Sequence, residues 1–275
     1  MVENILKIIY NIYMIDKDER YVIKENERLD ELGIKNLKVI QNTEFFCFGI
    51  DSVLLANFVK SNSSKNVILD MCSGSGVIPI LLSAKVNFDK AICVELQKEM
   101  FDLLKRNVAI NNLENKLNLL NCSINDIDNI KKHIFSINNT HNIDIITVNP
   151  PYKKIGTGIE NENTVKYIAR HEKFCTLEDI FSSSSKLLKS KGKLYLVHKP
   201  DRLVDLLSIS RKYKLEAKTI QFVNPRIDSK PSIVLIEYIK DGGNEVQVLP
   251  PIIEYDENGN YTDQILKIYN LERKV

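Results

Sequence analysis

The chain has 275 residues, 44% of them hydrophobic, and it carries 38 Lys and Arg against 36 Asp and Glu. The apolar content excludes a globally disordered chain, and the formal net charge of +2 excludes a histone-like polycation. Five cysteines are spread along the chain without a Cys-x-x-Cys pair, which excludes a disulfide framework and a zinc finger. They indicate reduced thiols in a cytoplasmic protein.

The N-terminal residues 4–15 are apolar, but they lack the basic stretch and the small-residue cleavage site of a signal peptide. They are also too short to span a membrane. We interpret them as an amphipathic helix or as translation that begins upstream of the true start, with Met14 as an alternative initiator. We expect an extension over 1–26 and one domain over 27–275, divided into a cap (27–65), a core (66–240) and a tail (241–275).

Short apolar runs alternate with segments of helical apolar spacing along most of the chain. In chain order we predict a helix at 50–60, a strand at 67–71, a helix at 76–85, a strand at 90–95, a helix at 97–112, strands at 117–122 and 143–148, a helix at 177–188, a strand at 192–198, a helix at 201–212, and strands at 215–223 and 232–239. The alternation predicts a parallel sheet covered on both faces, and the last two strands predict a hairpin.

The predicted fold class is therefore α/β, with a Rossmann-like, seven-stranded, mostly parallel sheet, helices on both faces and a C-terminal β-hairpin. Ligands of such sheets bind at the carboxyl ends of the strands. Charge is uneven along the sequence, because residues 151–240 have a net charge of +8 and the remainder −6. The basic part favours a polyanionic partner, although a merely solvated surface accounts for it equally well.

A turn of small residues follows the first predicted core strand. Its members are Asp70, Cys72, Ser73, Gly74 and Gly76. Glycines let the backbone approach a ligand, and the helix that follows offers free N–H groups. Pro79 stands in place of the third Gly of the dinucleotide fingerprint, and no Gly-Lys-Ser/Thr follows, so pyrophosphate binding is disfavoured. An acid at this strand end suits a cationic ligand, such as the amino group of a methionine moiety.

Acidic residues also follow the next two strands. Glu95 ends the second strand, 19 residues after Gly76, where an acid accepts hydrogen bonds from both hydroxyls of a ribose. Asp126 follows the third strand and is a candidate acceptor for an adenine amino group. Asn125 and Asp128 are rivals for that role, and helix capping explains any of the three.

The sequence Asn149-Pro150-Pro151-Tyr152 follows the fourth strand. Two prolines end the strand and stiffen the backbone. The Asn149 side-chain oxygen and the Pro150 carbonyl can both accept from one planar NH₂ group, while Tyr152 can stack on the ring that carries it. This is a receptor for an amine conjugated with a π-system. It holds the nitrogen lone pair toward an electrophile and needs no strong base, because alkylation makes the proton acidic.

Together these residues resemble the class I S-adenosylmethionine-dependent amino-methyltransferases. More closely, the chain is similar to the bacterial tRNA-valine adenine-37 N6-methyltransferases over residues 27–270. Further carriers of the similarity are Glu27–Asp30, Phe46–Ala56, Ala169–Glu172 and the pair Pro231-Ser232.

The resemblance implies S-adenosylmethionine as cofactor, contacted by Asp70, Cys72, Ser73, Gly74, Gly76, Glu95, Asp126 and Asn149. It also implies that Phe48–Asp51 fold over the methionine end, which adds Gly49 and Asp51 as candidates; plain helix capping by Asp51 is the alternative. Cys72 departs from the pattern, because many class I methyltransferases have Gly there. We expect Cys72 to fit with a negative φ and cofactor binding to survive.

Candidate RNA-binding residues are Lys153, Lys154, Arg170, His171, Arg226 and Lys230. Lys153 and Lys154 lie beside the target pocket and suit phosphates. Arg170 and His171 belong to a long polar segment, where an ion pair with Glu172 is the alternative. No histidine has metal-ligand spacing, so we expect no metal and interpret His133, His141 and His198 as structural.

The predicted function is methyl transfer from S-adenosylmethionine to N6 of an adenine in tRNA, at position 37 of a valine tRNA. A base in a loop leaves its stack at less cost than a base in a duplex. We expect a cytoplasmic monomer with tRNA as partner and no membrane association. The alternatives are a glutamine amide methyltransferase acting on a protein, a guanine N2-methyltransferase acting on ribosomal RNA, a non-enzymatic RNA-binding module and a dinucleotide oxidoreductase.

Overall fold

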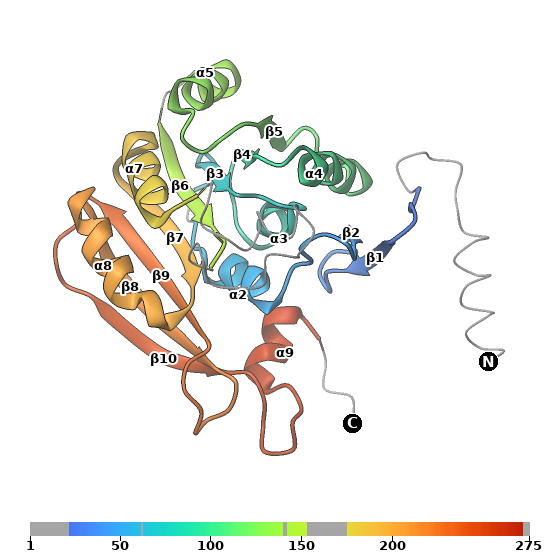
Figure 1. Cartoon of the computed structure of the whole chain (residues 1–275), viewed down its shortest axis with the longest axis vertical. Coiled ribbons are helices and arrows are strands. Elements are labelled where there is room, and N and C mark those ends of the chain that lie inside the picture. Colours follow the sequence, from blue (N-terminus) through green and yellow to red (C-terminus); the bar gives the residue numbers. More distant parts are fainter. Residues whose placement is uncertain (1–21, 62, 140–141, 153–174, 272–275) are drawn as a thin grey trace.

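The computed structural model describes residues 22–61, 63–139, 142–152 and 175–271. At its centre lies a sheet of eight strands in the order β10-β8-β9-β7-β6-β3-β4-β5 (Figure 1). The strands are β3 (Val67–Met71), β4 (Lys90–Glu95), β5 (Leu117–Asn121), β6 (Ile143–Val148), β7 (Leu188–His198), β8 (Leu215–Asn224), β9 (Ile233–Lys240) and β10 (Gln247–Ile253). All neighbours are parallel except β9, which is antiparallel to both β7 and β8.

Helices cover both faces of the sheet. They are α2 (Ile50–Phe58), α3 (Val77–Lys85), α4 (Lys98–Ile110), α5 (Ile127–Asn138), α7 (Leu177–Leu187), α8 (Leu203–Lys212) and α9 (Asp263–Tyr269), with a 3-10 turn, η2 (Pro200–Arg202). Within the described residues, every helix is too short or too polar to cross a bilayer.

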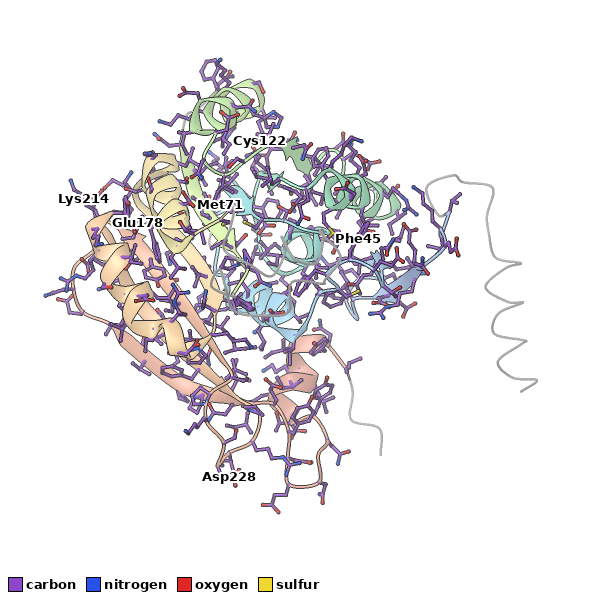
Figure 2. The ribbon with its side chains drawn as sticks, viewed as in Figure 1. Phe45, Met71, Cys122, Glu178, Lys214 and Asp228 are labelled. Carbon is purple, nitrogen blue, oxygen red and sulfur yellow. The ribbon has the colours of Figure 1, made fainter. Side chains whose placement is uncertain are left out.

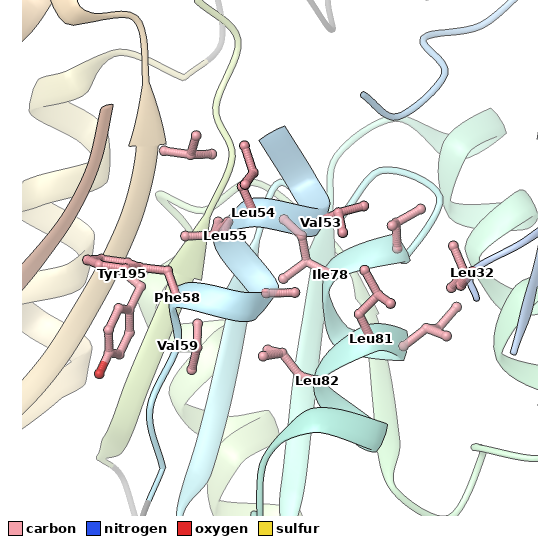
Figure 3. Close-up of a cluster of buried hydrophobic side chains, with 14 of the residues drawn as sticks. Leu32, Val53, Leu54, Leu55, Phe58, Val59, Ile78, Leu81, Leu82 and Tyr195 are labelled. Carbon is pink, nitrogen blue, oxygen red and sulfur yellow. The ribbon is translucent and has the colours of Figure 1, made fainter. Parts of the chain in front are cut away.

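The period-two alternation of a strand explains the two layers. In β3, Ile68 packs into the cluster that contains α2, α3 and α4, whereas Leu69 packs into the cluster that contains α5, α7 and α8. Figure 3 shows part of the first cluster, where Leu54 of α2 lies beside Ile78 of α3. Because both faces are covered, all five residues of β3 are buried, as the continuous apolar run predicts.

The seven predicted strands and the terminal hairpin are confirmed, and the structure adds an eighth strand. The additional strand, β10, lies in the predicted tail and pairs in parallel with β8 at the sheet edge. Its Pro250 and Pro251 fall where the pairing register shifts between Leu249 and Ile252, as expected for prolines in an edge strand. The tail also contributes α9, whose Ile265 and Ile268 join the main core cluster.

Three further elements were not predicted. In the cap, β1 (Glu27–Glu31) and β2 (Lys38–Asn42) form an antiparallel pair. Helix α5 occupies the segment between β5 and β6, with its apolar side chains at helical spacing from Ile127. That spacing was available in the sequence and identifies the helix.

The strand order reverses between β3 and β6. From β3 the chain continues to β4 and β5 on one side, and β6 and β7 then lie on the other. Strands that diverge in this way leave a crevice at their carboxyl ends, where ligands of open α/β sheets bind. The turn after β3 and the Asn149 turn after β6 are therefore neighbours.

Candidate functional site

A pocket of about 690 Å³ lies at the carboxyl ends of β3, β4 and β6. It is lined by residues of both predicted motifs, namely Cys72, Ser73, Gly74, Glu95, Asn149, Pro150, Pro151 and Tyr152. Met71 and Cys122, labelled in Figure 2, mark the ends of β3 and β5 on this side of the sheet. The structure therefore brings residues of both predicted motifs together in one pocket.

The turn after β3 is built from left-handed backbone. Cys72 has a φ of 57°, Gly74 of 54° and Gly76 of 87°. A Cβ at Gly76 would lie 2.4 Å from Leu104 Cδ1, so this position requires glycine for space as well as for φ. The expectation of a negative φ at Cys72 is wrong. The small Cys72 side chain instead packs its sulfur 3.4 Å from Cys175 Sγ.

Side chains from two neighbouring elements hold this turn in place. Glu95 Oε2 accepts from the Gly74 N–H over 2.8 Å, and Oε1 accepts from the Gln97 N–H over 2.8 Å. On the other side, the buried Asn107 of α4 donates to the Ser75 carbonyl over 2.9 Å. Asn107 also bonds both backbone groups of Ile40 in β2, so the cap and the turn are joined through one side chain. Asn107 was not predicted from the sequence.

Glu95 lies in the pocket wall with only 6% of its surface exposed. Burial raises the pKa of its carboxyl group, while the bonds from the Gln97 and Gly74 N–H groups lower it in part. Each carboxylate oxygen has more than one lone pair, so both can accept a further hydrogen bond from a ligand. The position suits the predicted contacts with two ribose hydroxyls.

Asp70 lies beneath the turn, fully buried and outside the pocket lining. Its Oδ1 accepts from Thr147 Oγ1 over 2.5 Å, whereas its Oδ2 is buried and has no hydrogen-bond partner within the described part of the chain. Burial raises the pKa of this carboxyl group to about 7. An orphaned carboxylate oxygen under the turn fits a cationic ligand group above it, although the direct contact with an amino group stays a prediction.

The structure does not bring Asp126 to the pocket. Its exposed carboxylate caps α5 by accepting from the Asn129 N–H, which is the capping alternative. Asn125 is no substitute, because its side chain bonds Asp179 and Ser183. The pocket wall after β5 consists of Cys122, Ser123 and Ile124. An adenine ring would meet sulfur and apolar side chains here rather than an acid.

The Asn149–Tyr152 turn is held from outside by the first turn of α2. Asn149 Nδ2 donates to Ser52 Oγ over 3.1 Å. The Tyr152 hydroxyl lies 2.8 Å from Asp51 Oδ2 and is also within hydrogen-bond distance of Asn149 Oδ1. Ser52 lines the pocket beside Asn149, although it was not predicted as a site residue.

Gly49 and Asp51 lie next to this contact rather than in the pocket lining. Gly49 precedes α2 in extended backbone, and a Cβ there would lie 3.0 Å from Asp51 Oδ1. Asp51 belongs to the helix itself and is 92% buried; it accepts from the Ser52 N–H over 2.9 Å, so simple N-capping is not its arrangement. Phe46 and Phe48, just before α2, line the pocket in their place.

Two residues at the end of β7 complete the side of the pocket formed by the Asn149–Tyr152 turn, which we call the acceptor side. The His198 ring packs against the Tyr152 ring, with centroids 5.0 Å apart and planes at 67°. Burial lowers the pKa of His198 to about 4, and its Nδ1 accepts from the Lys199 N–H, so the ring is neutral at pH 7. Lys199 lines the pocket with its ammonium 5.6 Å from the Tyr152 ring centroid. Their position at the carboxyl end of a strand next to β6 is the feature by which both residues could have been predicted.

The predicted RNA-binding residues divide into two groups. Lys153, Lys154, Arg170 and His171 lie outside the described residues. Arg226 and Lys230 are exposed in the loop between β8 and β9, outside the pocket lining; Asp228 in Figure 2 marks this loop. Within the described ranges, no group of three or more His, Cys, Asp or Glu residues is arranged to hold a metal ion.

Much of this chain matches known proteins. Residues 51–193 match the family described as Conserved hypothetical protein 95. A protein of Porphyromonas gingivalis named tRNA1(Val) (adenine(37)-N6)-methyltransferase is 24% identical over 212 residues, which cover 76% of this chain and 80% of that protein. A protein of Phocaeicola vulgatus with the same name is 23% identical over 190 residues, covering 69% of this chain and 75% of that protein.

Among solved structures, a predicted O-methyltransferase of Agrobacterium tumefaciens superposes with a TM-score of 0.60 and 16% identity, covering 80% of this chain and 95% of that one. This likeness shows a class I methyltransferase fold. The family match begins in α2 and ends in β7, so it spans the turn after β3, Glu95 and the Asn149 turn. The chain therefore belongs to the Conserved hypothetical protein 95 family, and it has a methyltransferase fold.

Proposed function

We propose that this protein transfers a methyl group from S-adenosylmethionine to N6 of an adenine in tRNA, namely adenine 37 of a valine tRNA. The observation that carries the proposal is the shared pocket, in which the Asn149–Tyr152 turn faces the Cys72–Gly76 turn and Glu95. The position of the target adenine rests on the names of the curated relatives.

The residues present fit such a cofactor. A pocket of about 690 Å³ is within the usual range for small-molecule sites. The Glu95 carboxylate also lines the pocket beside the Cys72–Gly74 turn, where it can accept hydrogen bonds from hydroxyl groups of the ligand. When bound, the cofactor supplies an electrophilic methyl group on a sulfonium. The apolar side chains of Leu96 and Ile124 offer a surface for its adenine ring.

On the acceptor side, this chain's own groups orient the nitrogen. The Asn149 Oδ1 and the Pro150 carbonyl accept from the two hydrogens of a planar NH₂ group, which turns its lone pair toward the methyl group. Neutral acceptors are sufficient, because the proton on the nitrogen becomes acidic once the new bond has formed. The rate then depends on holding donor and acceptor about 3–3.5 Å apart and in line.

For the RNA itself, we propose contacts from Lys199 in the pocket lining and from Arg226 and Lys230 on the β8–β9 loop. Phosphate contacts position a nucleic acid without reading its sequence. We also propose that the protein acts as a monomer in the cytoplasm, and that residues 27–275 form one functional domain preceded by an extension at 1–26. The packing of α9 from the tail into the main core supports the single-domain proposal.

The test is methyl transfer from labelled S-adenosylmethionine to three acceptors in parallel: tRNA lacking this modification, ribosomal RNA and a peptide release factor. Nucleoside and amino-acid mass analysis identifies the product. We expect N6-methyladenosine in tRNA alone. Label in N2-methylguanosine of ribosomal RNA, or in N5-methylglutamine of the release factor, would contradict the proposal and identify the alternative.

A further inference from the structure

The Tyr152 hydroxyl faces two acceptors but carries one hydrogen. Asp51 Oδ2 lies 2.8 Å from the Tyr152 oxygen, and Asn149 Oδ1 lies within hydrogen-bond distance on another side. When the hydroxyl donates to Asn149, it occupies the same oxygen that the proposed function assigns to the substrate amine. A bond from Tyr152 takes one of the two lone pairs of Asn149 Oδ1, whereas a bond to Asp51 leaves both lone pairs free. The choice of acceptor therefore decides whether the Tyr152 hydroxyl competes with the substrate amine for the Asn149 oxygen.

The Tyr152 hydroxyl retains its hydrogen in this setting. Burial, followed by the negative charge of Asp51, raises the pKa of Tyr152 well above its ordinary value. The hydroxyl therefore always has a hydrogen to donate. A carboxylate is a stronger acceptor than an amide oxygen, so Asp51 competes effectively for it.

The amide of Asn149 is oriented by the neighbouring residue of the same helix. Its Nδ2 donates to Ser52 Oγ over 3.1 Å, which fixes the oxygen of the amide on the Tyr152 side. Helix α2 holds Asp51 and Ser52 rigidly, because Val53, Leu54 and Leu55 are all buried in the main core cluster (Figure 3). One short helix thus controls both ends of the Asn149 amide.

We propose that Asp51 and Ser52 are positioning residues that keep Asn149 open for the substrate amine: Asp51 takes the hydrogen bond of Tyr152, and Ser52 fixes the Asn149 amide. This inference rests on the proposed function. No covalent bond changes in the step, and the hydrogen remains on the Tyr152 oxygen throughout. The substrate amine replaces the Tyr152 hydroxyl at Asn149 Oδ1, and the hydroxyl turns to Asp51.

The test is a double-mutant cycle on single-turnover methyl transfer to tRNA at saturating cofactor, with Asp51→Ala, Tyr152→Phe and the two combined. Among the described residues, Asn149 is the acceptor that Asp51→Ala leaves within reach of the Tyr152 hydroxyl, so we expect the rate to fall about 30-fold. Removing the hydroxyl as well reopens Asn149, so the double variant is expected to be about tenfold faster than Asp51→Ala. A simple loss of packing or of cofactor contact predicts the opposite, because a second truncation then adds to the first.

Ser52→Ala provides the second arm. With the orienting acceptor lost, we expect a lower single-turnover rate with little change in KM for tRNA, and recovery in Ser52→Thr, which retains a hydroxyl. Where Asp51→Ala unfolds, Asp51→Leu has a side chain of similar length without a hydrogen-bond acceptor, and the cycle is repeated on it. A double variant no faster than the Asp51 variant, with an active wild type, overturns the inference alone. A wild type that transfers no methyl group to tRNA overturns the proposed function and the inference with it.

Discussion

The two sides of the pocket are held by different means. The cofactor side is held through backbone: left-handed residues at Cys72, Gly74 and Gly76, and bonds from Glu95 and Asn107 to main-chain groups. The acceptor side is held through side chains, which join Asn149 and Tyr152 to a helix about a hundred residues earlier in the chain. The cofactor side is thus fixed through the conformation and hydrogen bonds of its main chain, whereas the acceptor side depends on contacts between side chains.

This difference separates the effects expected from substitutions. Substitutions on the cofactor side should change the free energy of unfolding and cofactor affinity together, because the turn packs against core residues such as Leu104. Changes on the acceptor side alter the rate of transfer with the fold intact.

The largest effect is expected for Asn149→Ala. Removing the oxygen that receives the amine should lower the single-turnover rate by about 10²–10³-fold, in line with the loss of one preorganised catalytic dipole. Cofactor binding, measured by calorimetry on the same sample, should be retained, with a change in affinity much smaller than the change in rate. A variant that methylates tRNA at the wild-type rate would mean that the amine-receptor argument is wrong.

Gly76→Ala tests the backbone side. The new Cβ meets Leu104 and is placed on left-handed backbone, so the free energy of unfolding should fall by about 3 kcal/mol. Gly259→Ala is the matched control, because Gly259 has a φ of 80° with no atom within 4 Å of its new Cβ. It should cost only the backbone strain of about 1 kcal/mol. If urea denaturation gave equal losses of stability for the two variants, the contact with Leu104 would not contribute to the effect of Gly76→Ala.

Asn107→Ala separates support of the turn from support of the cap. It leaves the Ser75 carbonyl and both Ile40 backbone groups without their partner, so stability should fall by about 2 kcal/mol and cofactor binding should weaken. Asn111 makes the same kind of bridge from α4 to β2 at Lys38 but does not contact the turn. Asn111→Ala should therefore lower stability and leave cofactor affinity unchanged. Calorimetry on both variants gives the comparison.

Asp70 introduces a pH dependence of stability on the cofactor side. Its pKa is raised to about 7 in the fold, so between pH 4 and pH 7 the folded chain binds a proton that the unfolded chain has lost. The Asp70 contribution to stability is therefore present in full below pH 4 and is lost as pH rises through 7, with a slope of about 1 kcal/mol per pH unit. In urea denaturation, the free energy of unfolding of Asp70→Asn should decline less steeply between pH 4 and pH 7 than that of the wild type. Exposed Asp128→Asn is the control, and a decline unchanged in Asp70→Asn would contradict the assignment.

The smallest effect is expected for Lys199→Ala. Loss of one cation at the pocket mouth should raise KM for tRNA a few-fold and reduce the salt slope of binding by about one. Lys212 on the exposed end of α8 lies outside the pocket lining and provides the matched control. If Lys212→Ala weakens tRNA binding as much as Lys199→Ala, the effect is one of total charge rather than of position.

Local sequence signals account for most of the fold and for the two motifs. Continuous apolar runs identify β3, β4 and β6, and the glycines and prolines after them mark the turns that form the pocket. The left-handed φ of Cys72 was not predicted, because a non-glycine residue usually avoids this region and its support comes from Cys175, 103 residues later. Strand β10 was missed because Pro250 and Pro251 argue against a strand except at an edge.

Contacts between distant residues explain what sequence patterns left out of the site. Asn107 and His198 carry no motif, and Ser52 lies in the Phe46–Ala56 stretch without a predicted role; each becomes part of the site through a partner that the fold brings near. Asp126 shows the reverse case, since a suitable residue after the right strand turns away to cap α5. Spacing predicts which strand end a residue follows but not which way its side chain is held.

The most direct test compares two valine tRNA transcripts in single-turnover methyl transfer, one with adenine at position 37 and one with guanine there. We expect one methyl group per molecule of the adenine transcript, recovered as N6-methyladenosine at position 37, and no incorporation into the guanine transcript. Equal incorporation into both transcripts would contradict this expectation, because the amine that Asn149 and Pro150 are proposed to receive would then not be the acceptor.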